Sequence, residues 1–241
     1  MKSLFIYVII LFSVQARAEF EKMTFNSKKI KDLRIINASG KLSVYASFDK
    51  NITVEFEKIR FPDSCKLDFK ETRKQLKVEV KENRKGYDDE SCLVNFRIRV
   101  PESLNLDITN GLGDLEVLGL KNRVKYMIGS GNVDLSGDFR ELIGKVGNGK
   151  QALRGYSKSS SLESGRGGFF IELDRALHKD SLLLKNGTGD ASVSLPDASN
   201  VNIQLQSGLG KLFSDFPTQT SKQAFAIKMR SGTGALRVKK N

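Results

Sequence analysis

Apolar and polar positions alternate around a Gly-x-Gly triplet that recurs in the second half of this chain. The second and fourth residues after each triplet are apolar at twelve of fourteen positions, Gln151 and Ser214 being the exceptions. The fifth and third residues before each triplet are also apolar, apart from Gly144 and Ser160. A period of two is typical of a strand with one buried face. Each repeat is therefore predicted to be a strand, a Gly-x-Gly corner and a second strand.

The triplet occurs seven times, at spacings of 18, 18, 18, 22, 21 and 24 residues. The first glycines of the triplets are Gly111, Gly129, Gly147, Gly165, Gly187, Gly208 and Gly232. A repeat of this length indicates a solenoid, because each coil can bury its apolar side only against its neighbours. A meander or sandwich is the alternative, but hairpins usually turn through two residues and alternate short with long connections. The predicted fold is all-β: a β-solenoid, that is, a single-stranded β-helix-like stack with Gly-x-Gly corners.

The first half of the chain is strand-rich but less regular. Residues 19–105 are interpreted as an irregular N-terminal β cap or the first coils, since the ends of a solenoid must close an open core. Within them, the segment from Asn37 to Leu42 resembles a degenerate corner. Residues 106–241 are predicted to hold the regular repeats, continuous with the cap.

The start of the chain has the form of a secretory signal peptide, residues 1–18. Met1-Lys2 is a short charged start, Leu4 through Phe12 is unbroken apolar sequence, and Ala16-Arg17-Ala18 is a small-x-small cleavage site. The apolar run is too short to span a bilayer as a helix, and no later stretch predicts a transmembrane segment in the mature chain. The protein is therefore predicted to be exported, to the periplasm or the cell surface.

The chain has two cysteines, Cys65 and Cys92. Export and their matching strand phase favour a disulfide between them, and two buried free thiols are the alternative. Two cysteines and the single histidine, His178, supply too few ligands for a metal site. Neither a metal nor another cofactor is predicted.

The chain is basic, with 40 Lys and Arg against 28 Asp and Glu and a net charge of +12. Removing the leader with Lys2 and Arg17 leaves +10. In an exported protein, anionic envelope polymers or surface glycans are more plausible partners than nucleic acid. A candidate patch comprises Lys228, Arg230, Arg237, Lys239 and Lys240. The alternative is that these charges serve solubility and protect strand edges.

No catalytic constellation is evident. A phosphate-binding Gly-rich loop needs a following helix, whereas each triplet here precedes an alternating strand. The best catalytic alternative is Glu116 with Asp134, which occupy equivalent positions on successive coils. Stacked strands lie ~4.8 Å apart, close to the ~5 Å between the carboxyl groups of retaining glycosidases. Solvated polar residues on an outward face are the simpler interpretation, so the protein is predicted not to be an enzyme.

A set of short motifs resembles a known family. The Asn37-Ala38-Ser39-Gly40-Lys41-Leu42 element precedes a Val100-Pro101 step and the run from Leu106 to Val117, which contains Asn110-Gly111-Leu112-Gly113-Asp114. This pattern is similar to the bacterial putative-adhesin family of unknown function, which is related to head-GIN domains. Lys150 and Lys211 depart from it, because acidic residues often follow the corner in that family.

The resemblance implies an exported β-solenoid and brings no catalytic residues. The predicted function is that of a non-enzymatic envelope protein, a structural or adhesive module that binds anionic surface polymers. The alternative is a carbohydrate-active enzyme, a polysaccharide lyase or hydrolase on a β-helix scaffold.

Overall fold

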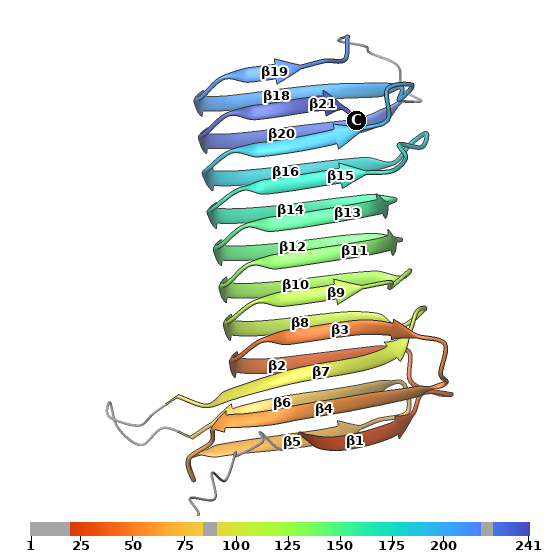
Figure 1. The fold of residues 1–241 in the computed structure, drawn as a ribbon, viewed down its shortest axis with the longest axis vertical. Coiled ribbons are helices and arrows are strands. Elements are labelled where there is room, and N and C mark those ends of the chain that lie inside the picture. The colour runs from red at the N-terminus through yellow and green to blue at the C-terminus, as the bar shows by residue number, and fades with distance from the viewer. Residues whose placement is uncertain (1–19, 84–90, 218–223) are drawn as a thin grey trace, which may run out of the picture.

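The computed structural model describes residues 20–83, 91–217 and 224–241, and these ranges contain strands but no helix (Figure 1). The strands form two large, mostly parallel sheets, A and B, with one hydrophobic core between them. The all-β class is confirmed. The predicted leader, residues 1–18, lies outside the described residues.

The chain contributes alternate strands to the two sheets over most of its length. In spatial order, sheet A consists of β1 (Glu21–Asn26), β4 (Asn51–Arg60), β7 (Leu93–Pro101), β3 (Leu42–Ser47), β9 (Leu115–Leu118), β11 (Val133–Phe139), β13 (Gln151–Ser157), β15 (Phe169–Leu173), β17 (Ala191–Leu195), β21 (Leu236–Lys240) and β19 (Leu212–Ser214). Sheet B consists of β18 (Val201–Leu209), β20 (Phe225–Thr233), β16 (Ser181–Thr188), β14 (Ser159–Arg166), β12 (Glu141–Asn148), β10 (Arg123–Ser130), β8 (Asn105–Leu112), β2 (Asp32–Ser39), β6 (Gln75–Glu82) and β5 (Cys65–Glu71).

Equivalent residues of successive repeats pair directly. In sheet B, Val124 of β10 lies opposite Leu106 of β8 on one side and Leu142 of β12 on the other. All three side chains are buried. In sheet A, Leu135 pairs with Val117 of β9 and with Leu153 of β13, and these side chains are also buried. The period-two pattern thus places one row of most strands in the core, as the sequence predicted.

Two of the exceptions to the apolar pattern belong to one buried cluster. The hydroxyl of Tyr126 donates a hydrogen bond to Gln151 Oε1 (2.6 Å), and Gln151 Nε2 donates to the carbonyl of Glu163 (2.8 Å). Gly144 makes room for this cluster, since a Cβ there would overlap the Tyr126 ring. Burial raises the pKa of Tyr126, so its hydroxyl remains a neutral donor.

The corners stack one on another along the molecule. The second glycines follow in the order Gly40, Gly113, Gly131, Gly149, Gly167, Gly189, Gly234 and Gly210. At Gly149, φ is 146°, and a Cβ would collide with the carbonyl oxygen of Gly131. Gly40 starts this row, which confirms that the Asn37–Leu42 segment forms a corner of the later kind.

The repeats do not stack in chain order at the two ends. At the C-terminal end, β20 and β21 lie between β16/β17 and β18/β19, so the last strands of the chain are interior (Figure 1). At the other end, β2 and β3 pair with β8 and β9, while β6 and β7 pair on their far side. Periodicity predicts that these strands stack but not which strand each one joins.

The N-terminal region ends in antiparallel pairs, β1 with β4, β4 with β7, and β5 with β6. The predicted disulfide is present: Cys65, the first residue of β5, is bonded to Cys92, which immediately precedes β7. The bond therefore links the edge of sheet B to a strand of sheet A.

The assignment of alternate side chains to the core and to the outer face can be tested with two neighbouring residues of β11. Leu135 is 1% exposed, whereas Asp134 lies on the outer face and pairs with Arg154 (2.8 Å). Leu135→Asp should lower the free energy of unfolding by about 4 kcal/mol, because it buries an unpaired carboxylate and removes apolar contacts. Asp134→Leu removes a solvent-exposed ion pair and should cost less than about 1 kcal/mol. Equal losses in urea unfolding would contradict the assignment.

The disulfide closes a loop with a sequence separation of 27 residues. Replacing Cys65 and Cys92 together by alanine should destabilise the protein by about 3.5 kcal/mol, because the open chain gains conformational entropy when it unfolds. Chemical unfolding of the oxidised protein and of the double variant measures the difference. Two thiols that react with an alkylating agent before reduction would show that the bond does not form.

Candidate functional site

The five cations predicted to form one patch are divided between two faces. Lys228 and Arg230 are on β20 in sheet B, whereas Arg237, Lys239 and Lys240 are on β21 in sheet A. The buried side chains of the same strands, such as Met229 and Val238, lie between the two faces. Lys240 also forms an ion pair with Asp197 (2.5 Å). Residues close in sequence do not share a face here, because consecutive strands belong to opposite sheets.

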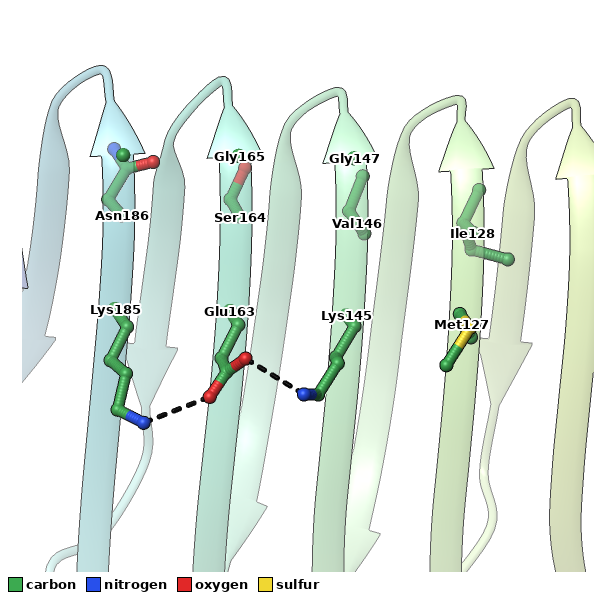
Figure 2. Close-up of a pocket in the computed structure, with 11 residues that line it drawn as sticks. Met127, Ile128, Lys145, Val146, Gly147, Glu163, Ser164, Gly165, Lys185 and Asn186 are labelled. Carbon is green, nitrogen blue, oxygen red and sulfur yellow. Dashed lines mark hydrogen bonds and ion pairs between the residues drawn. The ribbon is translucent and has the colours of Figure 1, made fainter.

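The outer face of sheet B carries a row of alternating charge. Glu163 lies between Lys145 (3.1 Å) and Lys185 (3.0 Å), which come from the two neighbouring strands (Figure 2). The hydrogen bonds from Lys185 and then Lys145 lower the pKa of Glu163, so the carboxylate stays ionised at neutral pH. The three side chains and the exposed Met127 line a hollow of about 590 Å³. Both lysines already share this carboxylate, which weakens the face as a site for a free anion.

A second groove of about 650 Å³ lies along the corners between β14/β15 and β16/β17. Lys150, Arg166 and Arg237 line it, together with Phe170 and Asp190. We call it the corner groove. Its cations come from three separate repeats: Lys150 follows one triplet, Arg166 is the middle residue of the next, and Arg237 lies on β21.

The corner groove exposes an aromatic ring. Phe170 is 46% exposed on the outer face of β15, opposite Ala152 of β13 and Ser192 of β17. These small neighbours leave the ring uncovered on both sides. Arg237 of β21 is the next residue in the same row, opposite Ser192. The groove therefore combines a flat apolar surface with a nearby guanidinium.

A break in a ladder of hydrogen bonds leaves the groove open. Just after the corner glycine, Asp114 Oδ1 accepts from the backbone N–H of Asn132 (2.7 Å), and Asn132 Oδ1 accepts from that of Lys150 (3.0 Å). Lys150 has no acceptor to continue the series, and Gly168 in the next repeat has no side chain. The ladder resumes at Asp190, whose Oδ1 accepts from Ala235 (2.8 Å).

The cations of the corner groove are not neutralised by the described part of the protein. Neither Lys150, Arg166 nor Arg237 forms an ion pair with a residue in those ranges, and Asp190 is the single acidic residue in the lining. Arg154 on the same sheet, by contrast, contacts both Asp134 (2.8 Å) and Glu172 (3.6 Å). The groove thus carries a net charge of +2 and is suited to an anion.

The two carboxylates considered for catalysis lie side by side on the outer face of sheet A, as their repeat position predicted. Glu116 Oε2 accepts a hydrogen bond from the hydroxyl of Tyr45 (2.9 Å), and Asp134 pairs with Arg154. Both groups therefore take part in cross-strand contacts that join neighbouring strands.

Within the described ranges, no group of three or more His, Cys, Asp and Glu side chains is placed to hold a metal ion. The same ranges contain no helix long and apolar enough to cross a membrane.

The corner groove was not predicted from the sequence. Two residues signal it: Lys150 is a cation at the position after the triplet, where the related family often has an acidic residue, and the equivalent position in the next repeat is Gly168, which has no side chain. The sequence does not predict that Phe170 and Arg237 lie near these residues, because their proximity depends on the pairing of β21 with β17.

Similar architectures are known among solved bacterial proteins. No protein-family model matches the chain, and no curated protein matches it in sequence. A putative adhesin from Bacteroides fragilis NCTC 9343 is 16% identical, with 93% of this chain and 98% of that chain covered and a TM-score of 0.54. A putative lipid binding protein from Parabacteroides distasonis ATCC 8503 is 12% identical, with 90% and 96% covered and a TM-score of 0.51. The resemblance expected from the sequence is confirmed in the fold.

Proposed function

We propose that the protein is an exported, non-enzymatic β-solenoid module of the bacterial envelope that binds an anionic surface polymer. Each repeat supplies one strand to each sheet and one corner, which is the repeating unit of such a solenoid. The signal peptide predicted at residues 1–18 supports export. The disulfide supports it too, because such bonds persist in oxidising compartments.

The observation that carries the binding function is the set of cations in the corner groove without acidic partners. Lys150, Arg166 and Arg237 line the same groove as the exposed ring of Phe170. An acidic polysaccharide matches this arrangement: its carboxylate or sulfate groups pair with the cations, and the C–H face of a sugar ring packs on the phenyl ring.

A lipid is a second source of anionic groups, and one solved protein of this fold is named as lipid binding. We favour a glycan, because an acyl chain needs an extensive apolar cavity and the groove presents one exposed phenyl ring. The lipid alternative predicts binding to anionic vesicles that survives high salt, since buried chains are insensitive to screening.

Titration of the protein with polygalacturonate, with neutral dextran as the control polymer, tests the proposal. We expect binding to polygalacturonate alone, with an affinity that falls steeply as salt is added. Replacing Lys150, Arg166 and Arg237 by alanine should weaken binding about tenfold, at roughly 0.5 kcal/mol for each screened charge. The matched control replaces Lys145, Lys228 and Arg230 on sheet B, which removes the same charge.

Equal losses in the two triple variants would show that net charge alone attracts the polymer and would contradict a site in the corner groove. Binding that is unchanged between low and high salt would reject the electrostatic mechanism. The release of reducing ends or unsaturated products from polygalacturonate, abolished by Glu116→Gln, would favour the enzyme alternative.

A further inference from the structure

At the C-terminal end of the molecule, each sheet ends in a strand that is paired on one side only. Within the described ranges, β18 pairs with β20 alone, and β19 pairs with β21 alone (Figure 1). An edge strand presents free N–H and C=O groups on its outer side, which makes it a template for a further strand. The two edges lie at the same end, so one partner can reach both.

Among the described residues, no further strand covers the hydrophobic core at this end. Leu212 of β19 pairs with the buried Leu236 and continues its inward row, yet Leu212 is 51% exposed. Ile203 and Leu205 of β18 continue the row of Ile227 and Met229, which are 1% and 0% exposed, but they are only partly buried. One more layer would bury these side chains as completely as those of the interior repeats.

The strand at this edge lacks the charges that normally prevent pairing. The nine residues of β18, with the sequence VNIQLQSGL, include neither a charged residue nor a proline in a chain that is 28% charged. The opposite end is different: its edge strands β1 and β5 carry lysines and glutamates, and Glu21 and Asp68 form ion pairs there. Charged residues on an edge are a common protection against association.

A second copy of this chain has the geometry that the open end requires. A two-fold axis perpendicular to the sheets would set β18 antiparallel to β18 of the other copy and β19 antiparallel to its counterpart, so that both sheets continue. Full overlap of β18 centres the axis on Leu205 and places Gln204 opposite Gln206 of the other copy. The contact is then self-complementary, as a closed dimer requires.

The area of such a contact is adequate. A nine-residue strand is ~30 Å long, and two packed sheets are ~20 Å thick with their side chains. A contact over the whole end face would therefore bury at most ~1,200 Å² in total, at the lower limit for specific interfaces, because β19 has only three residues.

We propose that two copies of the protein associate end to end through β18 and β19 and bury Ile203, Leu205 and Leu212 between them. The dimer would contain two corner grooves along one continuous stack of strands. The dimer contact itself does not depend on which ligand the corner grooves bind.

Two double variants on the outward side of β18 test this inference. Gln204→Glu with Gln206→Glu places like charges opposite one another across the two-fold axis. The new carboxylates neighbour Lys228 and Arg230 of β20 within each copy, so the fold itself should not suffer. The matched control, Gln204→Glu with Gln206→Lys, places opposite charges across the axis.

Sedimentation of the purified proteins over a wide concentration series gives the dimer dissociation constant, and thermal unfolding confirms that each variant is folded. We expect a dimer for the natural sequence, an at least tenfold weaker dimer for the Glu/Glu variant, and a retained dimer for the Glu/Lys variant. A natural protein that stays monomeric throughout would overturn the inference. A Glu/Glu dimer as tight as the natural one, or equal weakening of both variants, would overturn the antiparallel β18 contact.

Discussion

The stacking of corner glycines is the constraint on which the rest of the structure depends. At Gly131, Gly149 and Gly167 the backbone has positive φ, and each glycine lies so close to a carbonyl of the preceding corner that no Cβ fits. This close approach fixes the register of both strands that meet at the corner. A slip of one residue would exchange the buried and exposed rows of a strand. The position of each corner therefore decides which side chains form the core and which form the outer faces.

The same register places like positions of successive repeats in rows, and in some of these rows neighbouring charges neutralise one another. Lys145, Glu163 and Lys185 form one such row, and the contacts of Arg154 form another. In the corner groove, the ladder of hydrogen bonds that follows the corner glycines is interrupted. Lys150, which has no acceptor, and Gly168, which has no side chain, together cause this interruption. The corner groove and the scaffold thus derive from the same repeat, and the groove lies where the sequence of the repeat changes.

Much of this architecture could be predicted from the sequence, because it depends on local pattern. The alternation of apolar residues identified the buried rows, the triplets identified the corners, and the strand phase of Cys65 and Cys92 identified the disulfide. The exceptions needed the structure: Gly144 and Gln151 make sense only beside Tyr126. The pairing partners of the strands at the two ends could not be predicted either. The sequences of β20 and β21 follow the same pattern as every other repeat, so the pattern does not show that they lie between β16/β17 and β18/β19. For that reason the five cations of the predicted basic patch lie on two different sheets, and the corner groove depends on the pairing of β17 with β21.

The role of glycine stacking can be tested by comparing the free energy of unfolding of the Gly149→Ala variant with that of the Asn148→Ala variant. Both residues belong to one triplet, but Asn148 is exposed and its side chain makes no hydrogen bond or ion pair with the described residues. We expect Gly149→Ala to lower the free energy of unfolding by at least about 3 kcal/mol, since the methyl group would separate two stacked corners and strain a residue with positive φ. Asn148→Ala should change it by less than about 0.5 kcal/mol. Similar, small effects of the two substitutions would contradict the claim that glycine stacking determines this structure.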